Sequence, residues 1–162
     1  MDMSYLKKLD IKLVKSKYSN PIKGQVYRPE QVYKVFHDIK DKAQETLIAV
    51  YLNNDLISLA YNVVSVGNRC TTVAEPRDIY GYGYVLLANY YILIHNHPQG
   101  NPNPSKEDHT TIRELISSAK MMKMNLLDFI IIGELSEKNK KKNYWSLFEQ
   151  LDGGEYSLGS VS

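Results

Sequence analysis

The feature that most constrains the fold of this chain is a short, proline-rich connector at residues 98–104, between two apolar segments. It holds three prolines and a glycine, a composition that cannot continue a strand and resists helix formation. The preceding residues 90–95 are apolar and β-branched and predict a largely buried strand. Ser105 is a natural helix N-cap, and apolar residues at spacings of three and four predict an amphipathic helix over about 105–124. We therefore expect a strand, a stiff connector and a helix in direct succession.

Apolar periodicity and turn residues predict further elements on both sides of this unit. They are helices over about 30–43 and 76–89, a β-hairpin formed by 47–52 and 56–66, and a strand over 126–133. Gly81 and Gly83 each lower the stability of the second helix by roughly 1 kcal/mol relative to alanine. The two glycines therefore lower the rigidity expected of that helix.

The chain has the size of a single domain, with 162 residues. Hydrophobic residues make up 43% and charged residues 23%, which matches ordinary globular usage. We expect a domain over 29–150, preceded by an N-terminal arm over 1–28 and followed by a flexible tail over 151–162. Weak apolar alternation near Ile11 allows either an extended segment or an edge strand within the arm.

Hydropathy and charge restrict the setting in which the protein works. No apolar run approaches the roughly 18 residues needed to cross a bilayer, and the first residues carry charge where a signal peptide is apolar. We therefore expect a cytoplasmic protein without membrane association. The net charge of +2 is small, and the basic stretch at 138–142 is interpreted as a solvated loop in preference to a nucleic-acid contact.

The histidines are the first candidate functional residues. Cys70 is the only cysteine, which excludes an intramolecular disulfide and every metal site with two or more thiolates. Any metal ion must therefore be held by histidines and carboxylates. His95 and His97 are two residues apart, and in an extended chain this spacing directs both imidazoles to the same side of the backbone. The pair suits one metal ion, although a hydrogen-bonded turn at a strand end is the simpler explanation for such a pair alone.

Asp108 adds a carboxylate eleven residues after His97. With Ser105 it forms a pattern close to a helix capping box, which by itself accounts for both residues. Asp108 also lies one helical turn before Ile112, near the apolar stripe of the predicted helix, where an unpaired carboxylate is costly to bury. A nearby cation removes that cost. Two imidazoles and one carboxylate leave a fourth tetrahedral position open, which is the composition of a catalytic zinc site.

These residues together resemble a known signature. Residues 95–98, His-Asn-His-Pro, with Ser105 and Asp108, resemble the JAMM motif, in which His-x-His is followed after seven residues by Ser-x-x-Asp. The Asn-His-Pro and Pro-Ser elements are similar to those of RadC-like JAB/JAMM (MPN-plus) domains, and the likeness covers about residues 29–150. It implies an α/β fold of the JAMM/MPN type, a cytidine-deaminase-like sandwich in which helices flank a mixed, curved β-sheet. Gln99 departs from the RadC pattern, which usually has serine there, outside the ligand set.

The same resemblance implies a chemistry. One zinc ion per chain is expected, held by His95, His97 and Asp108. Glu45 matches by position the family glutamate that hydrogen-bonds the zinc-bound water and moves its proton, and Ser105 matches the serine that donates to the developing oxyanion. The implied activity is that of a zinc metallopeptidase-like hydrolase of amide or isopeptide bonds. Its substrate would be a peptide or an isopeptide-linked protein, and its biological association DNA repair or mobile elements.

A different class of function is a DNA-repair accessory protein that binds DNA or a protein partner, with a metal site that is structural or unused. The helix-hairpin-helix region that often precedes RadC-like domains has no counterpart within residues 1–28, so a built-in DNA-binding module is not expected. A nuclease is disfavoured, because nuclease motifs named His-Asn-His are spread over a hairpin and a helix. A cytidine deaminase is disfavoured because its paired cysteines are absent.

Overall fold

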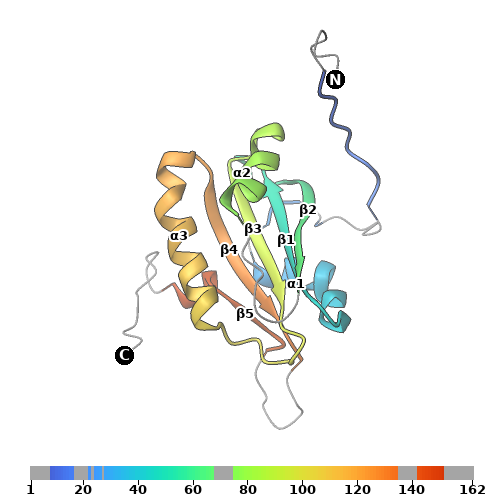
Figure 1. Cartoon of the computed structure of the whole chain (residues 1–162), viewed down its shortest axis with the longest axis vertical. Helices are drawn as coiled ribbons and strands as arrows, with labels where there is room; N and C mark the ends of the chain where they lie inside the picture. The colour runs from blue at the N-terminus through green and yellow to red at the C-terminus, as the bar shows by residue number, and fades with distance from the viewer. Residues whose placement is uncertain are drawn as a thin grey trace, which may run out of the picture.

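One five-stranded β-sheet forms the centre of the computed structural model, which describes residues 8–16, 22, 24–26, 28–67, 75–134 and 142–151 (Figure 1). The strands are β1 (Glu45–Leu52), β2 (Ser58–Gly67), β3 (Tyr90–Asn96), β4 (Asn125–Ile132) and β5 (Tyr144–Ser146). The α-helices within these residues are α1 (Pro29–Phe36), α2 (Pro76–Val85) and α3 (Lys106–Met122), and two 3₁₀ helices are η1 (His37–Asp41) and η2 (Phe148–Gln150).

The order of the strands across the sheet is β2-β1-β3-β4-β5. β1 pairs antiparallel with both β2 and β3, β3 pairs parallel with β4, and β4 pairs antiparallel with β5. A parallel pair needs a crossover connection between its strands, and the proline-rich connector together with α3 supplies it. These pairings confirm the mixed, curved sheet flanked by helices that the sequence analysis predicts (Figure 1).

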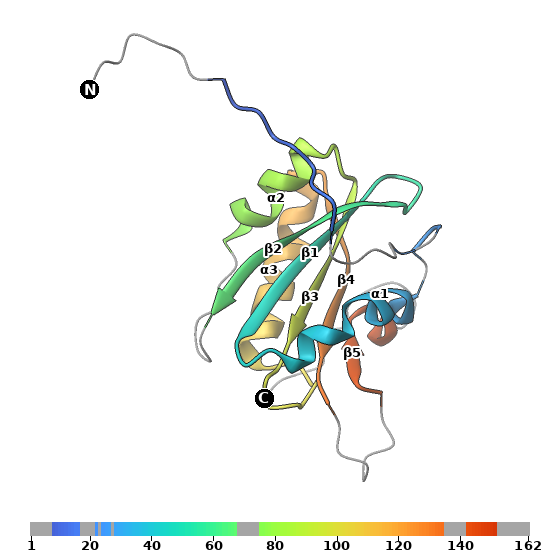
Figure 2. The ribbon, with the colours of Figure 1, turned by 90° about the vertical axis from the view of Figure 1, so that its right-hand side faces the viewer.

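The central strands are buried because both faces of the sheet are covered. Figure 2 shows α2 and α3 on one face and α1 on the other. Alternate residues of each strand face opposite layers. Leu47 and Leu93 pack in the layer of α2 and α3, whereas Ile48 and Ile94 pack in the layer of α1. Side chains at odd positions of β1 and β3 therefore share the layer of α3, which decides where the functional side chains point.

The predicted strands and the β-hairpin are confirmed, and the helices differ in their ends. The first α-helix ends at Phe36 and continues as the 3₁₀ helix η1 instead of running on to residue 43. Val32, Phe36 and Ile39 are all buried, and their spacing shortens from four residues to three. A 3₁₀ helix has three residues per turn, so this tightening keeps Ile39 beneath Phe36.

The second helix also ends earlier than predicted, at Val85 instead of residue 89. The chain leaves the helix through Leu87, which has a φ of 53°. The Asn89 N–H then donates to the carbonyl of Leu52, the last residue of β1. A β-carbon at Gly83 would displace the end of the Met124 side chain, whereas a β-carbon at Gly81 would meet open space.

Several expectations concern segments near the chain ends. Residues 8–16 have no regular secondary structure, so the edge-strand alternative for that part of the arm is wrong. Cys70, residues 138–141 of the basic stretch and residues 152–162 of the expected tail lie outside the described residues. The helices of the described part are all too short or too polar to cross a membrane.

Candidate metal centre

The two histidines of the motif lie at the C-terminal end of β3. His95 is within the strand, opposite Leu47 of β1 and beside Ile131 of β4. His97 follows the strand, and its N–H donates to the Ile132 carbonyl at 3.0 Å, so the extended backbone continues past the last strand residue. The two imidazole rings therefore lie on the same side, with ring centres 4.8 Å apart and planes at 86°.

Asp108 reaches the histidines from the first turn of α3. The Ser105 N–H donates to Asp108 Oδ2 at 2.7 Å and the Ser105 hydroxyl donates to the same oxygen at 2.6 Å. The Asp108 N–H donates in turn to Ser105 Oγ at 3.1 Å. The capping-box interpretation of these residues is thus confirmed. The cap fixes the carboxylate and leaves Oδ1 facing His95.

The three side chains form a compact group of possible metal ligands. His95 Nε2 lies 3.6 Å from Asp108 Oδ1, and His97 Nε2 lies 3.3 Å from Asp108 Oδ2. One donor atom from each residue falls within 4.8 Å of the others. Their side chains are only 8%, 15% and 10% exposed. Two imidazole nitrogens and a carboxylate oxygen match the donor set of a catalytic zinc site, so these residues fit a metal ion.

The connector between β3 and α3 fixes the orientation of the His97 ring. His97 Nδ1 lies 2.6 Å from the Asn101 carbonyl. Because a carbonyl only accepts, Nδ1 carries a proton in both the charged and the neutral ring, and Nε2, which faces Asp108, is the nitrogen that loses its proton when the ring becomes neutral. Metal-ligating histidines in general donate their second ring N–H to an oxygen in this way. The loop thus selects the tautomer that can bind a metal ion through Nε2.

Two glycines hold this loop against the end of β4. The Glu134 N–H donates to the Gly100 carbonyl at 2.8 Å, and Gly100 has a φ of 84°, a conformation that favours glycine. A β-carbon on Gly133 would overlap the Gly100 carbonyl. The close approach of the two backbones is therefore possible only with glycine at position 133, and it sets the position of Asn101 beside His97.

Burial and the interactions among the three side chains shift their pKa values in opposite directions. Burial lowers the pKa of His95 to about 4, against the attraction of Asp108. Burial would also lower the pKa of His97, but its hydrogen bonds to Asp108 and to the Asn101 carbonyl raise it. Burial would raise the pKa of Asp108, but hydrogen bonds from His97 and Ser105 and the attraction of His95 lower it to about 2. At neutral pH the site therefore holds a carboxylate and at least one neutral imidazole.

Glu45, the first residue of β1, occupies the same layer as the histidines. It lies two residues before Leu47, which faces the α3 layer and is paired with His95, so strand alternation directs its side chain toward that layer. Its charge is one of the groups that raise the pKa of His97. Glu45 is thus near the histidines without belonging to the group of three possible ligands.

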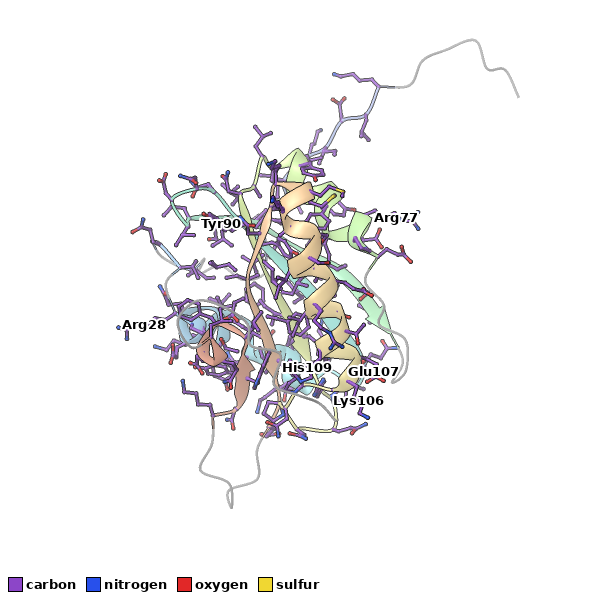
Figure 3. All side chains as sticks on the ribbon, turned by 90° about the vertical axis from the view of Figure 1, so that its left-hand side faces the viewer. Arg28, Arg77, Tyr90, Lys106, Glu107 and His109 are labelled. Carbon is purple, nitrogen blue, oxygen red and sulfur yellow. The ribbon has the colours of Figure 1, made fainter. Side chains whose placement is uncertain are left out.

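Other residues around this end of the sheet bear on the site. Lys106, Glu107 and His109 surround the first turn of α3 in Figure 3. The His109 ring is half-buried and packs 6.4 Å from the Trp145 ring. It does not belong to the group of possible ligands. Sequence reasoning missed Asn96, whose buried side chain contacts the segment around Glu45, because a contact between residues 50 positions apart leaves no local pattern.

Comparison with known families decides the classification. The sequence model of the protein family described as the RadC-like JAB domain matches residues 26–152 of this chain.

The chain belongs to the RadC-like JAB family.

A UPF0758 protein of Streptococcus uberis is 34% identical over 142 residues, which cover 87% of this chain and 59% of that protein. A UPF0758 protein of Aquifex aeolicus is 36% identical over 109 residues, covering 67% of this chain and 47% of the relative. A third, from Methanosarcina mazei, is 30% identical over 113 residues, covering 69% of this chain and 49% of the relative. This RadC-like JAB chain spans about half the length of the curated relatives it matches.

Proposed function

We propose that this RadC-like JAB domain is a zinc-dependent hydrolase of amide or isopeptide bonds, acting on a peptide or an isopeptide-linked protein. The observation that carries the proposal is the buried group of His95, His97 and Asp108, whose donor atoms lie within 4.8 Å of one another. The donor set supports zinc over calcium or magnesium, which prefer oxygen ligands. When bound in such a site, zinc lowers the pKa of a bound water and polarises a carbonyl group.

The protein side chains supply the remaining functions. Asp108 stays charged at neutral pH, and the Ser105 hydrogen bonds hold its carboxylate in one orientation. The Asn101 carbonyl holds a proton on Nδ1 of His97, so Nε2 is the nitrogen that would bind the metal ion in the neutral ring. Both features prepare the ligands before an ion arrives, and preorganised ligands bind without a further cost of ordering.

Glu45 is assigned the role of general base. Its place at the start of β1, on the layer of the histidines, supports this role. Ser105 is assigned a hydrogen bond to the developing oxyanion, a type of interaction that contributes about 2.7–4 kcal/mol in comparable sites. The Ser105 hydroxyl donates to Asp108 in this structure, so the oxyanion role requires the hydroxyl to turn away from the carboxylate.

The test is a hydrolysis assay on the zinc-loaded protein, with a panel of peptides and of peptides joined through a lysine side chain, read by mass spectrometry. We expect Glu45→Gln to lower kcat by about 10²–10⁴-fold while zinc remains bound. The control is Glu107→Gln, since Glu107 is exposed at the start of α3, and we expect it to retain activity.

Full activity in Glu45→Gln, or activity that survives removal of zinc by a chelator, would contradict the proposal. An inactive wild type that binds DNA with a strong dependence on salt, unchanged in Glu45→Gln, would instead favour the accessory role in DNA repair.

A further inference from the structure

Asn96 stands between the two histidines, and its side chain points to the opposite face of the sheet. His95 faces the layer of α3, so alternation places Asn96 in the layer of η1. Asn96 is completely buried, and a buried amide must be hydrogen-bonded to avoid a large desolvation cost. The partners of its hydrogen bonds therefore indicate the role of this side chain.

In the part of the chain that the structure describes, these partners are backbone groups on the two sides of Glu45. Asn96 Oδ1 accepts a hydrogen bond from the Thr46 N–H at 2.7 Å. Asn96 Nδ2 donates to the Lys42 carbonyl at 3.5 Å and to the Gln44 carbonyl at 3.4 Å. One side chain thus bridges the residue before Glu45 and the residue after it.

This bridge lies where the β-ladder between β1 and β3 stops. The pairing of β1 with β3 ends at Leu47 and His95. Beyond that pair β1 remains paired with β2 as far as Glu45, but residues 42–46 have no backbone pairing with β3. The hydrogen bonds of Asn96 replace the missing ladder bonds, so the Glu45 backbone is held relative to the strand that carries both histidines.

We propose that Asn96 is a positioning residue that holds Glu45 at the distance from His95 and His97 that proton transfer needs. This inference rests on the proposed function, in which Glu45 is the general base. The tripeptide His95-Asn96-His97 then has two tasks, with its histidines binding the metal ion on one face of the sheet and its asparagine holding the base from the other.

The expected effect follows from the sensitivity of catalysis to geometry. Proton transfer requires heavy atoms within hydrogen-bond reach, and a displacement of about 1 Å costs on the order of 100-fold in rate. Loss of the bridge should therefore lower kcat strongly. Metal binding and KM should change little, because the hydrogen bonds of the Asn96 side chain go to the backbone of residues 42–46 and not to the ligand side chains.

The experiment compares Asn96→Ala with Asp128→Ala. Asp128 is a buried side chain that likewise bridges backbone groups, here the Phe129 and Phe148 N–H groups, away from the histidines. Serine variants of both positions replace the alanine variants if these do not fold. Hydrogen exchange of the Thr46 and Phe148 amides, zinc content and hydrolysis of the peptide panel are measured for each protein and for Glu45→Ala with and without Asn96→Ala.

We expect Asn96→Ala to speed exchange at Thr46 and to lower kcat by about 100-fold, with zinc retained. Asp128→Ala should speed exchange at Phe148 and leave kcat near that of the wild type. Asn96→Ala should add no further loss to Glu45→Ala, since it acts through Glu45.

Three results would overturn the positioning role: unchanged exchange at Thr46, a loss of kcat no larger than in Asp128→Ala, or a loss that adds fully to that of Glu45→Ala. If the zinc-loaded wild type hydrolyses nothing on the panel, the proposed function fails and the catalytic part of this inference fails with it. The exchange of Thr46 then still decides whether Asn96 holds the segment that carries Glu45.

Discussion

Two buried carboxylates of this RadC-like JAB domain have similar hydrogen bonds and opposite electrostatics. Asp108 accepts from the N–H and the hydroxyl of Ser105. Asp128 accepts from the N–H groups of Phe129 and Phe148 and from the hydroxyl of Ser146. The pKa of Asp108 is lowered to about 2, whereas burial raises the pKa of Asp128 to about 7 despite its hydrogen bonds.

The difference lies in the neighbouring imidazoles. Asp108 faces His95 and His97 within 3.6 Å, and their attraction favours the charged form. Within the described residues, the hydrogen-bond donors to Asp128 are neutral, and the nearby charge of Glu149 repels the charged form. A buried carboxylate beside two imidazoles is thus kept charged and suits a cation, while one among N–H and O–H donors serves to fasten strands together.

The largest expected effect separates the two carboxylates by metal affinity. Asp108→Asn keeps the shape of the side chain and removes its charge, and we expect zinc affinity to fall by more than about 100-fold, since loss of a residue that only supports a ligand costs 10–100-fold. Asp128→Asn should bind zinc as the wild type does. Competition titration against a zinc chelator measures both. Equal zinc affinities of the two variants would contradict this difference between the two carboxylates.

The next effect concerns stability against pH. The pKa of Asp128 is raised on folding, so the stability that this group contributes is fully present below its ordinary pKa and is lost as the pH rises through about 7. Asp128→Asn cannot titrate. The free energy of unfolding of the wild type should therefore fall relative to Asp128→Asn by a few kcal/mol between about pH 4 and 8, at about 1.4 kcal/mol per unit of pKa shift. Urea denaturation at a series of pH values gives this difference, and parallel curves would contradict it.

The two serines extend the comparison at smaller magnitude. Ser105→Ala removes the N-cap and one donor to Asp108, and we expect a loss of about 1 kcal/mol in stability and of about 10–100-fold in zinc affinity. Ser146→Ala removes the hydroxyl that donates to Asp128 and should lower stability by about 1 kcal/mol with zinc affinity unchanged. A fall in zinc affinity for Ser146→Ala would show that the two carboxylates are coupled.

The smallest effect tests whether stability changes elsewhere reach the metal site. Gly81 lies in α2, where a β-carbon would meet open space. Gly81→Ala should therefore raise the free energy of unfolding by up to about 1 kcal/mol through helix propensity, with no change in zinc affinity. Thermal denaturation with and without zinc gives both values, and a loss of stability would show that the glycine has a packing role.

Local sequence patterns predicted the parts of this molecule whose causes are local. Alternation placed His95 and His97 on one side of β3, and the capping pattern placed Asp108 at the start of α3. The predicted end of the first helix was wrong. The switch to a 3₁₀ helix follows the packing of Ile39 and is not marked by any helix-breaking residue.

Features that depend on contacts between distant segments could not be predicted. β5 has three residues, too few to show a period, and it is identified by its pairing with the distant strand β4. The bridge of Asn96 to residues 42–46 and the contact of Gly133 with Gly100 likewise join parts of the chain that are far apart in sequence.

The most direct test of the central claim is anomalous diffraction at the zinc edge from crystals of the zinc-loaded protein. We predict one peak within about 2.0–2.2 Å of His95 Nε2, of His97 Nε2 and of one Asp108 carboxylate oxygen. No peak at these residues after zinc loading, or a peak bound only by other side chains, would contradict the assignment of this end of β3 as a metal centre.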